Sequence, residues 1–278
     1  MTFDTLNTST EDGAPIDLIT FNVGSETFRF TNAEDELTVL SLTYEPIAIS
    51  RDPVELGVEA RTQTVSARMP ADHPYAVKYL GVPPGRKTTG VIQVVHRDDL
   101  TDVRTEFTGL LRSVGFDALG AEAEIIMLPL TGALLRVVPR FLFSGMCNHV
   151  LYDGGCGVNR SSFTHNGVGA TTADSQIITV SGLDAAKGAG WATGGYCEFN
   201  NDARGVFRHL ATNQLVIVAP FKESIAGQTV SVYAGCDHEY GGDCAATGSG
   251  GKFNNQARFG GFPFVPTKNP FIGKINQQ

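Results

Sequence analysis

The sequence predicts an all-β protein of two domains, on three observations. Several segments alternate apolar and polar residues with a period of two, and turn residues recur between these segments. No stretch shows a sustained 3.6-residue apolar period with helix caps. Many short strands with regular turns favour β-barrels or sandwiches over an architecture of parallel strands connected by helices. With 278 residues, of which 42% are hydrophobic, the chain is long enough to build a substantial core.

The first half contains four alternating segments. Strands are expected over residues 17–31, 62–69, 88–96 and 121–130. The first of these is a hairpin that turns at Gly24-Ser25, and further turn signals occur at Pro83-Pro84-Gly85 and Asp98-Asp99. Only residues 69–80 resemble a helix, and Pro74 limits its length.

The second half continues in strands. They are expected over residues 175–182, over 205–221 as a hairpin turning at Thr212-Asn213, and over 226–235. All five cysteines and 22 of the 32 glycines lie beyond residue 140, which places a domain boundary near Pro139–Phe143. The sequence therefore predicts domains over 1–140 and 141–278, the second of them rich in glycine.

The net negative charge comes entirely from the first domain. The formal net charge is −8, and residues 1–140 carry 20 acidic and 12 basic residues, whereas residues 141–278 carry nine of each. A protein that grips nucleic acid needs clustered Lys and Arg, so this composition argues against stable DNA or RNA binding.

The N-terminal residues MTFDTLNTSTEDG have no basic start and no apolar run, and 18 consecutive apolar residues occur nowhere. We therefore expect neither a cleaved export signal nor stable membrane insertion. A chain made and kept in the reducing cytosol would hold its cysteines as thiols or metal ligands rather than as disulfides.

Four cysteines form two similar pairs. Cys147 and Cys156 stand in CNHVLYDGGC, and Cys236 and Cys244 stand in GCDHEYGGDC; each pair has Gly-Gly shortly before its second cysteine. Structural zinc sites usually use a tighter spacing of two to four residues between paired ligands, so these wider loops suit a larger group such as a cluster held by four thiolates. Zinc, disulfides and unlinked thiols remain open alternatives at this stage.

The fifth cysteine and the histidines are assigned other roles. Cys197 follows an aromatic residue in a predicted strand, and we expect it to be a buried free thiol. His149 and His238 each stand beside a proposed ligand, and we expect them to donate hydrogen bonds near the site. A Cys147–His149 nucleophile pair has no third orienting group in the sequence pattern, and no G-x-S-x-G or H-E-x-x-H motif occurs.

The C-terminal segment carries a resemblance to a known family. Residues 252–271, KFNNQARFGGFPFVPTKNPF, contain the pattern F-x-N-x3-F-x-G-F-P-x2-P, made by Phe253, Asn255, Phe259, Gly261, Phe262, Pro263 and Pro266. With the preceding GCD and Cys244, this resembles the C-terminal domain of tail hub proteins of siphophages and gene transfer agents, and more distantly the minor tail protein L of lambda. The resemblance is specific over about 141–270 and looser over 1–140, where it is carried by residues 28–46 and the length of the β segment.

The resemblance implies a cofactor and a fold. In this family four cysteines hold a [4Fe-4S] cluster, and by position these are Cys147, Cys156, Cys236 and Cys244, with zinc as the alternative metal. It implies an N-terminal β-barrel hub domain that forms a ring, followed by a β domain organised round the cluster. Phe253, Phe259 and Phe262 are expected to pack over the site, and the prolines to keep the chain extended.

The resemblance also implies partners and a place. It points to a virion structural protein rather than an enzyme, most simply a homotrimer at the tail tip, between a hexameric distal tail protein and a central tail fibre. DNA would pass through the lumen during ejection, and an acidic wall would repel phosphates. Two rivals stay open: a tail-associated Cys peptidase acting on cell wall, with Cys147 or Cys156 as nucleophile, and a zinc-stabilised β binding module.

Overall fold

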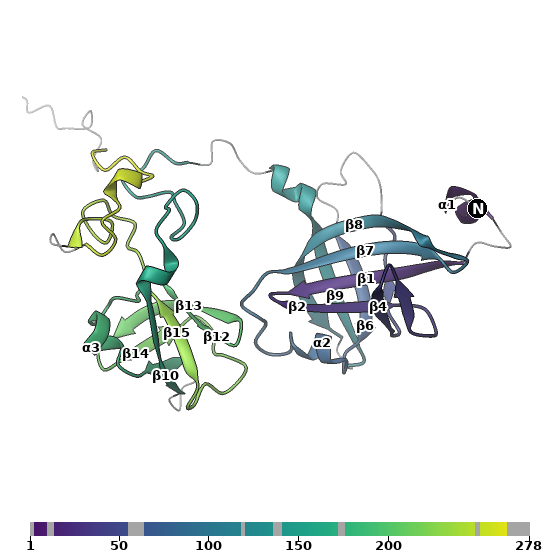
Figure 1. The fold of residues 1–278 in the computed structure, drawn as a ribbon, viewed down its shortest axis with the longest axis horizontal. Coiled ribbons are helices and arrows are strands. Elements are labelled where there is room, and N and C mark those ends of the chain that lie inside the picture. Colours follow the sequence, from purple (N-terminus) through teal and green to yellow (C-terminus); the bar gives the residue numbers. More distant parts are fainter. Residues whose placement is uncertain are drawn as a thin grey trace, which may run out of the picture. The chain divides into compact units, whose positions relative to one another are not determined.

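A computed structural model of the chain divides it into two compact units, Met1–Arg136 and Val137–Gln278 (Figure 1). The structure describes residues 3–9, 14–54, 64–117, 120–135, 141–171, 176–247 and 251–265. The boundary expected between residues 140 and 141 falls at the edge of residues 136–140, which lie outside these ranges. No helix in the described part combines the length and apolar character needed to span a bilayer.

The first unit is one nine-stranded sheet in the order β3-β4-β2-β1-β7-β8-β9-β6-β5. Its strands are β1 (Pro15–Val23), β2 (Glu26–Thr31), β3 (Leu37–Val39), β4 (Leu42–Pro46), β5 (Ser50–Arg51), β6 (Val65–Pro70), β7 (Thr88–His96), β8 (Asp99–Phe116) and β9 (Glu122–Pro129). Helix α1 (Phe3–Thr8) precedes the sheet, and the four-residue α2 (Pro74–Val77) follows β6.

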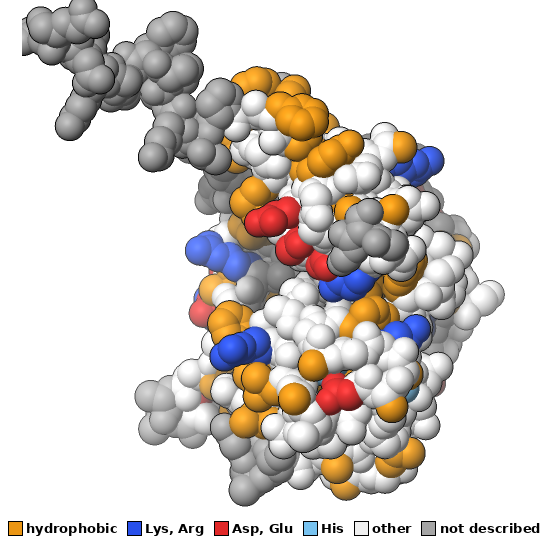
Figure 2. Space-filling view, turned by 90° about the vertical axis from the view of Figure 1, so that its left-hand side faces the viewer, with side chains coloured by type: hydrophobic (Ala, Val, Ile, Leu, Met, Phe, Trp, Pro, Cys, Tyr) orange, Lys and Arg blue, Asp and Glu red, His pale blue; other side chains and the backbone are white. Residues whose placement is uncertain are grey.

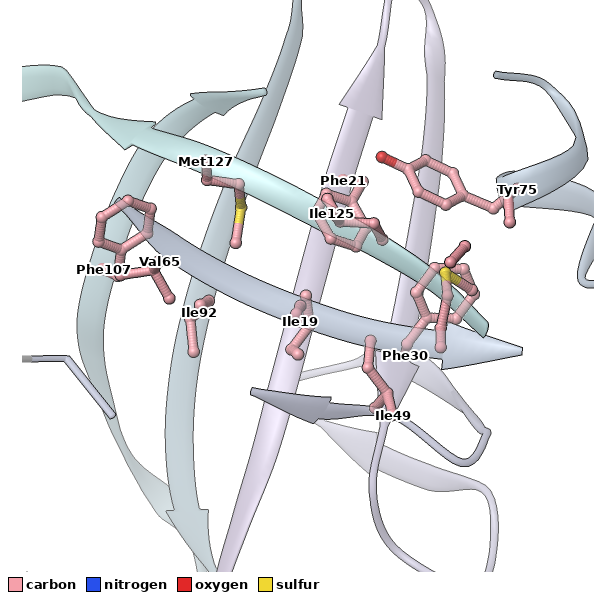
Figure 3. Packing of buried hydrophobic residues seen from close by; sticks show 14 of the residues in the cluster. Ile19, Phe21, Phe30, Ile49, Val65, Tyr75, Ile92, Phe107, Ile125 and Met127 are labelled. Carbon is pink, nitrogen blue, oxygen red and sulfur yellow. The ribbon is translucent and has the colours of Figure 1, made fainter. Parts of the chain in front are cut away.

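Alternating apolar residues produce the core of this unit. In β6 and β9 every second residue is buried, and the two strands pair antiparallel so that their buried positions share one face. Figure 3 shows Ile19 and Phe21 of β1, Phe30 of β2 and Ile125 of β9 around a common interior. Tyr75 of α2 stacks on Phe21 with ring centroids 4.7 Å apart, so the short helix closes one side of the core.

The sheet of the first unit differs from the barrel that we expected there. Its end strands are β3 and β5, with three and two residues, and among the described strands no pairing joins them. The all-β prediction is confirmed, but the closed barrel lies in the other unit. Both edges are short, so few backbone groups are left unpaired at the ends of the sheet.

The second unit contains a closed six-stranded antiparallel barrel in the order β10-β11-β14-β13-β12-β15. The strands are β10 (Thr164–Thr171), β11 (Ile177–Val180), β12 (Tyr196–Phe199), β13 (Asp202–Leu210), β14 (Gln214–Ile217) and β15 (Thr229–Tyr233). Helix α3 (Leu183–Lys187) follows β11, and short 3₁₀ helices span Arg160–Phe163 and Gln256–Arg258. A further 3₁₀ helix, Leu130–Leu135, follows β9 in the first unit.

The hairpin predicted at Thr212-Asn213 is confirmed as the β13–β14 turn. The last paired residues are Leu210 and Gln214, so the turn contains Ala211, Thr212 and Asn213. Thr212 and Asn213 have positive φ, 69° and 60°, the left-handed conformation that tight hairpin turns often use. The barrel interior contains Trp191, Cys197 and Phe253 among its buried residues. Phe253 comes from the segment after the last cysteine, so the barrel core extends into the region of the four cysteines.

Candidate metal centre

Four cysteines from two distant segments line one cavity. Cys147, Cys156, Cys236 and Cys244 all contribute to its wall, together with Asn255. Cys244 is buried, the other three are half-buried, and none of the five cysteines forms a disulfide. The loops are joined directly, because the Cys147 backbone N–H donates to the carbonyl of His238 over 2.9 Å.

The first loop is closed by Asp153. Its carboxylate accepts hydrogen bonds from the backbone N–H of Cys156 at 2.7 Å and of Val150 at 3.3 Å, and its carbonyl accepts from Gly157 at 2.7 Å. A Cβ on Gly155 would overlap the ring of His149. Asp and Gly before the second cysteine are therefore what a tight, reversing loop at this place requires.

The second loop is closed by an Asp pair. The Asp243 carboxylate accepts from the Asp237 N–H at 3.0 Å, and the Asp243 N–H lies 3.1 and 3.2 Å from the two Asp237 carboxylate oxygens. A Cβ on Gly242 would overlap the Asp237 carboxylate, whereas one on Gly241 would meet nothing within 4 Å. The reciprocal bonds place Cys236 and Cys244 at the two ends of a closed loop.

A third segment supplies hydrogen-bond donors to sulfur. The backbone N–H of Gly260 lies 3.3 Å from Cys147 Sγ, and the Asn255 amide lies 2.8 Å from the Cys156 carbonyl and 3.7 Å from its Sγ. Within the second loop, the N–H of His238 donates to Cys236 Sγ over 3.3 Å. Such donors stabilise negative charge on a thiolate and are typical of metal–sulfur sites.

Burial is the main influence on the pKa of two of these thiols, Cys236 and Cys244. Burial raises the pKa of Cys236 to about 11, and burial followed by the neighbouring Cys147 and Cys156 raises the pKa of Cys244. A bound cation reverses this situation, because metal coordination deprotonates a thiol outright. Binding of a metal by these thiols would therefore release protons.

The spacing of the sulfur atoms bears on which metal group fits. Potential metal-ligand atoms are the ring nitrogens of His, the Sγ of Cys and the carboxylate oxygens of Asp and Glu. Of the described residues, only Cys236, Asp237 and Asp243 bring three of these atoms within 4.8 Å of one another, so no three of the four cysteine sulfurs are that close. Thiolates around a single zinc, each about 2.3 Å from the ion, would be about 3.8 Å apart. A four-iron cluster binds each thiolate at a different iron and keeps the sulfurs further apart.

Other expected residues are placed as follows. His149 and His238 line the cavity, and the His238 bond to sulfur comes from its backbone rather than from its ring. Phe253 and Phe259 line the cavity too, whereas Phe262 is 47% exposed and contacts Phe143 with ring centroids 4.2 Å apart. The expectation that Phe262 packs over the site is therefore wrong, and Pro266 lies outside the described residues.

Cys197 is buried in the barrel core, as predicted. Its side chain is fully buried, its Sγ lies 3.6 Å from the Arg204 carbonyl, and burial raises its pKa to about 12. It does not line the cavity of the other four cysteines.

Arg258 and Lys252 belong to the site, and the sequence analysis missed them. Arg258 lines the cavity and packs against Gly157, while Lys252 joins the second cysteine loop to the barrel. Both lie in residues 252–271, the segment after the last cysteine that carries the family resemblance, and this is the signal that was available.

One end of the second unit exposes apolar side chains. Figure 2 shows hydrophobic side chains gathered at the upper end of this unit, over the segments drawn teal and yellow in Figure 1. The exposed hydrophobic residues of these segments include Phe141, Leu142, Phe143, Met146 and Phe264, the last 87% exposed. Hydrogen bonds tie the two segments together, among them Phe262 N–H to the Ser144 carbonyl at 2.9 Å.

Comparisons with known proteins find similarity to a protein family and to a solved structure. The family described as "Phage conserved hypothetical protein BR0599" matches residues 190–269, which include the second cysteine pair and the Phe/Gly/Pro segment. None of the curated proteins matches the sequence. A chain of a solved structure titled "Virion of native gene transfer agent (GTA) particle" is 17% identical, with a TM-score of 0.74, covering 100% of this chain and 96% of that chain. The chain thus shares its fold with a chain of a gene transfer agent virion structure, and residues 190–269 of its second unit are similar to a phage family.

Proposed function

We propose that this protein is a structural component of a phage or gene transfer agent virion, the hub at the tip of a long non-contractile tail. The observation that carries the proposal is the meeting of two cysteine loops at one cavity of the second unit, next to the segment that resembles a phage family. Two cysteine loops about 80 residues apart meet at one cavity, and the segment that closes it belongs to the region similar to a phage family. The fold shared with a virion chain over the whole length supports it.

We further propose that Cys147, Cys156, Cys236 and Cys244 hold a [4Fe-4S] cluster with a structural role. No three of the four sulfurs lie within 4.8 Å of one another, which supports a cluster over a single zinc. The N–H donors to three of the sulfurs support metal-bound thiolates. When bound, the group would cross-link residue 147 to residue 244, so that its binding free energy adds to the folding of the second unit. Such a cross-link suits a part that stays rigid while the tip opens.

The assembly is proposed as a ring, a homotrimer that joins a hexameric distal tail protein to a central tail fibre. Exposed apolar side chains such as Phe143 and Phe264 support association with other chains of a particle. The acidic excess of residues 1–140 supports a lumen through which DNA passes without sticking. The protein would be made in the host cytoplasm and function in the virion.

The test is the metal content of protein purified without oxygen. We expect a brown protein with about four irons and four acid-labile sulfides per chain. Cys→Ser at each of the four positions should lower the iron content, and Cys197→Ala, in the same unit but outside the cavity, should leave it unchanged. One zinc per chain without iron would replace the cluster with a zinc-stapled β module.

The hub assignment has its own test. Light scattering should give three times the chain mass of 29.6 kDa, and electron microscopy of tails with an antibody to the chain should label the tip. Antibody label on the capsid alone would contradict the hub assignment. A peptidoglycan-cleaving activity lost in Cys147→Ser or Cys156→Ser, with folding intact, would replace the structural role with a peptidase.

A further inference from the structure

Lys252 is a partly buried lysine whose ammonium group has a full set of partners. Its side chain is 17% exposed. The acceptors are the Trp191 carbonyl at 3.1 Å, the Gly235 carbonyl at 2.9 Å and the Asp243 carboxylate at 2.9 Å. An ammonium has three protons to donate, so each can be engaged by one of these acceptors.

Two of the three acceptors directly precede a cysteine of the second pair. Gly235 is followed by Cys236, and Asp243 is followed by Cys244. The third acceptor, Trp191, is part of the barrel core, and its carbonyl also accepts the Gly235 N–H at 3.1 Å. One side chain therefore joins both ends of the second cysteine loop to the barrel.

The backbone of Lys252 reinforces the connection. The N–H groups of Lys252 and Phe253 both lie 2.9 Å from the Asp243 carbonyl. Phe253 itself is buried in the barrel core. Lys252 is thus held on one side by the cysteine loop and on the other by the core, and its ammonium is fixed rather than free to sample solvent.

Charge gives this lysine a second effect. The Asp243 carboxylate is 19% exposed and lies in the same loop as Cys236 and Cys244, where four thiolates would gather. Lys252 neutralises the carboxylate, which would otherwise repel the negative sulfurs. A mostly buried ion pair that loses one partner leaves an uncompensated charge, unlike an exposed surface pair.

We propose that Lys252 is the positioning residue for the second cysteine pair. It holds Cys236 and Cys244 against the barrel at the spacing that the metal group requires, without contacting that group. The inference rests on the proposed metal site. It extends the site to a residue that touches neither the metal nor a sulfur.

The test compares Lys252→Met with Lys187→Met. Methionine keeps most of the side-chain length and removes the charge. The ammonium of Lys187 lies 5.1 Å from the Trp191 ring centroid, so the control removes another lysine charge beside the same tryptophan. After anaerobic reconstitution, the rate of metal loss to a chelator is followed by absorbance. We expect Lys252→Met to lose the group about 10- to 100-fold faster than wild type, the range typical for partners of metal ligands. Lys187→Met should match wild type.

A second readout needs no metal. In the metal-free chain, Cys236 and Cys244 should be alkylated by iodoacetamide faster in Lys252→Met than in wild type, while the rates at Cys147 and Cys156 stay the same. Fluorescence of Trp191, the only tryptophan, reports whether the barrel is folded. If Lys252→Met does not fold, Asp243→Asn removes the ion pair and keeps a group that can accept from Asp237, and it should show the same selective increase.

The outcomes separate the two proposals. Equal chelator and alkylation rates in wild type and Lys252→Met, with both barrels folded, would overturn the role of Lys252. Wild-type protein that takes up neither iron nor zinc would overturn the metal site, and the alkylation pattern would still decide whether Lys252 positions the second cysteine pair.

Discussion

Neighbouring glycines in the second cysteine loop differ in whether a side chain fits. A Cβ on Gly242 would overlap the Asp237 carboxylate, which closes the loop by accepting from the Asp243 N–H, and one on Gly241 would meet nothing within 4 Å. In Gly242→Ala the Asp237 carboxylate must move and lose its hydrogen bond from the Asp243 N–H, so the second unit should be destabilised by about 1 kcal/mol. Gly241→Ala should be close to neutral. Denaturant unfolding followed by Trp191 fluorescence measures both, and equal midpoints would contradict the close packing at Gly242.

His209 is the buried histidine of the second unit for which a pH effect is expected. Its Nε2 lies 2.8 Å from the Asp184 carboxylate, and its Nδ1 accepts the Ala192 N–H at 3.3 Å. Burial lowers the pKa of His209, with Asp184 opposing the effect in part. A proton on Nδ1 would also face the Ala192 N–H, so the neutral form fits the folded state.

This arrangement predicts a loss of stability in mild acid. Because the pKa in the folded chain lies below the ordinary value of about 6.5, the unfolded chain binds the proton more tightly. The contribution of neutral His209 to the free energy of unfolding is present above about pH 6.5 and is lost as the pH falls below this value. In His209→Gln, whose amide can accept from Ala192 and donate to Asp184, the unfolding free energy should depend less on pH between 7 and 5. Parallel pH curves for wild type and variant would contradict this assignment.

At the scale of the element, the β13–β14 turn holds a residue that its geometry disfavours. Thr212 is β-branched and has a φ of 69°, a region where such residues are rare. Thr212→Asn should stabilise the second unit by roughly 1 kcal/mol, because Asn adopts positive φ more readily than a β-branched residue. Thr212→Val, which keeps the branch, should give no gain. The midpoints of chemical unfolding measure both variants. A gain in stability in both would contradict the assignment of the effect to backbone strain at Thr212.

Element prediction succeeded where one face of a strand is buried and the other is not. The first hairpin, β6, β7, β9 and the β13–β14 hairpin all follow alternating segments, and their turns carry Gly or Asn. The sequence analysis missed β8, although it is 18 residues long. Most of its residues are at least partly exposed, so its composition shows no clear alternation, and its pairing with β7 and β9 holds it in place.

At the scale of the whole molecule, metal removal should affect the two units differently. The contact pattern divides the chain into two compact units, and all four cavity cysteines lie in the second. Binding free energy at a site stabilises the unit that forms it. Treatment with an oxidant and a chelator should therefore speed amide hydrogen exchange in β12 and β15 and leave β7 unchanged. Mass spectrometry of the exchanged peptides measures these rates. An equal increase of the exchange rate in both units would contradict the prediction that the metal stabilises only the second unit.

The sequence by itself determined the all-β class, several strands and turns, the pairing of the cysteines in two similar loops and the burial of Cys197. Those features depend on local spacing, because period-two patterns and loop residues act over a few positions. The similarity of the two cysteine loops also predicted one shared site, and the structure brings both pairs, some 80 residues apart, to one cavity. Only the tertiary structure decided which unit closes into a barrel and that Lys252 and Asn255 contact the cysteine loops. Barrel closure and these contacts depend on pairings between distant segments, and the residues concerned carry no local sign of their partners.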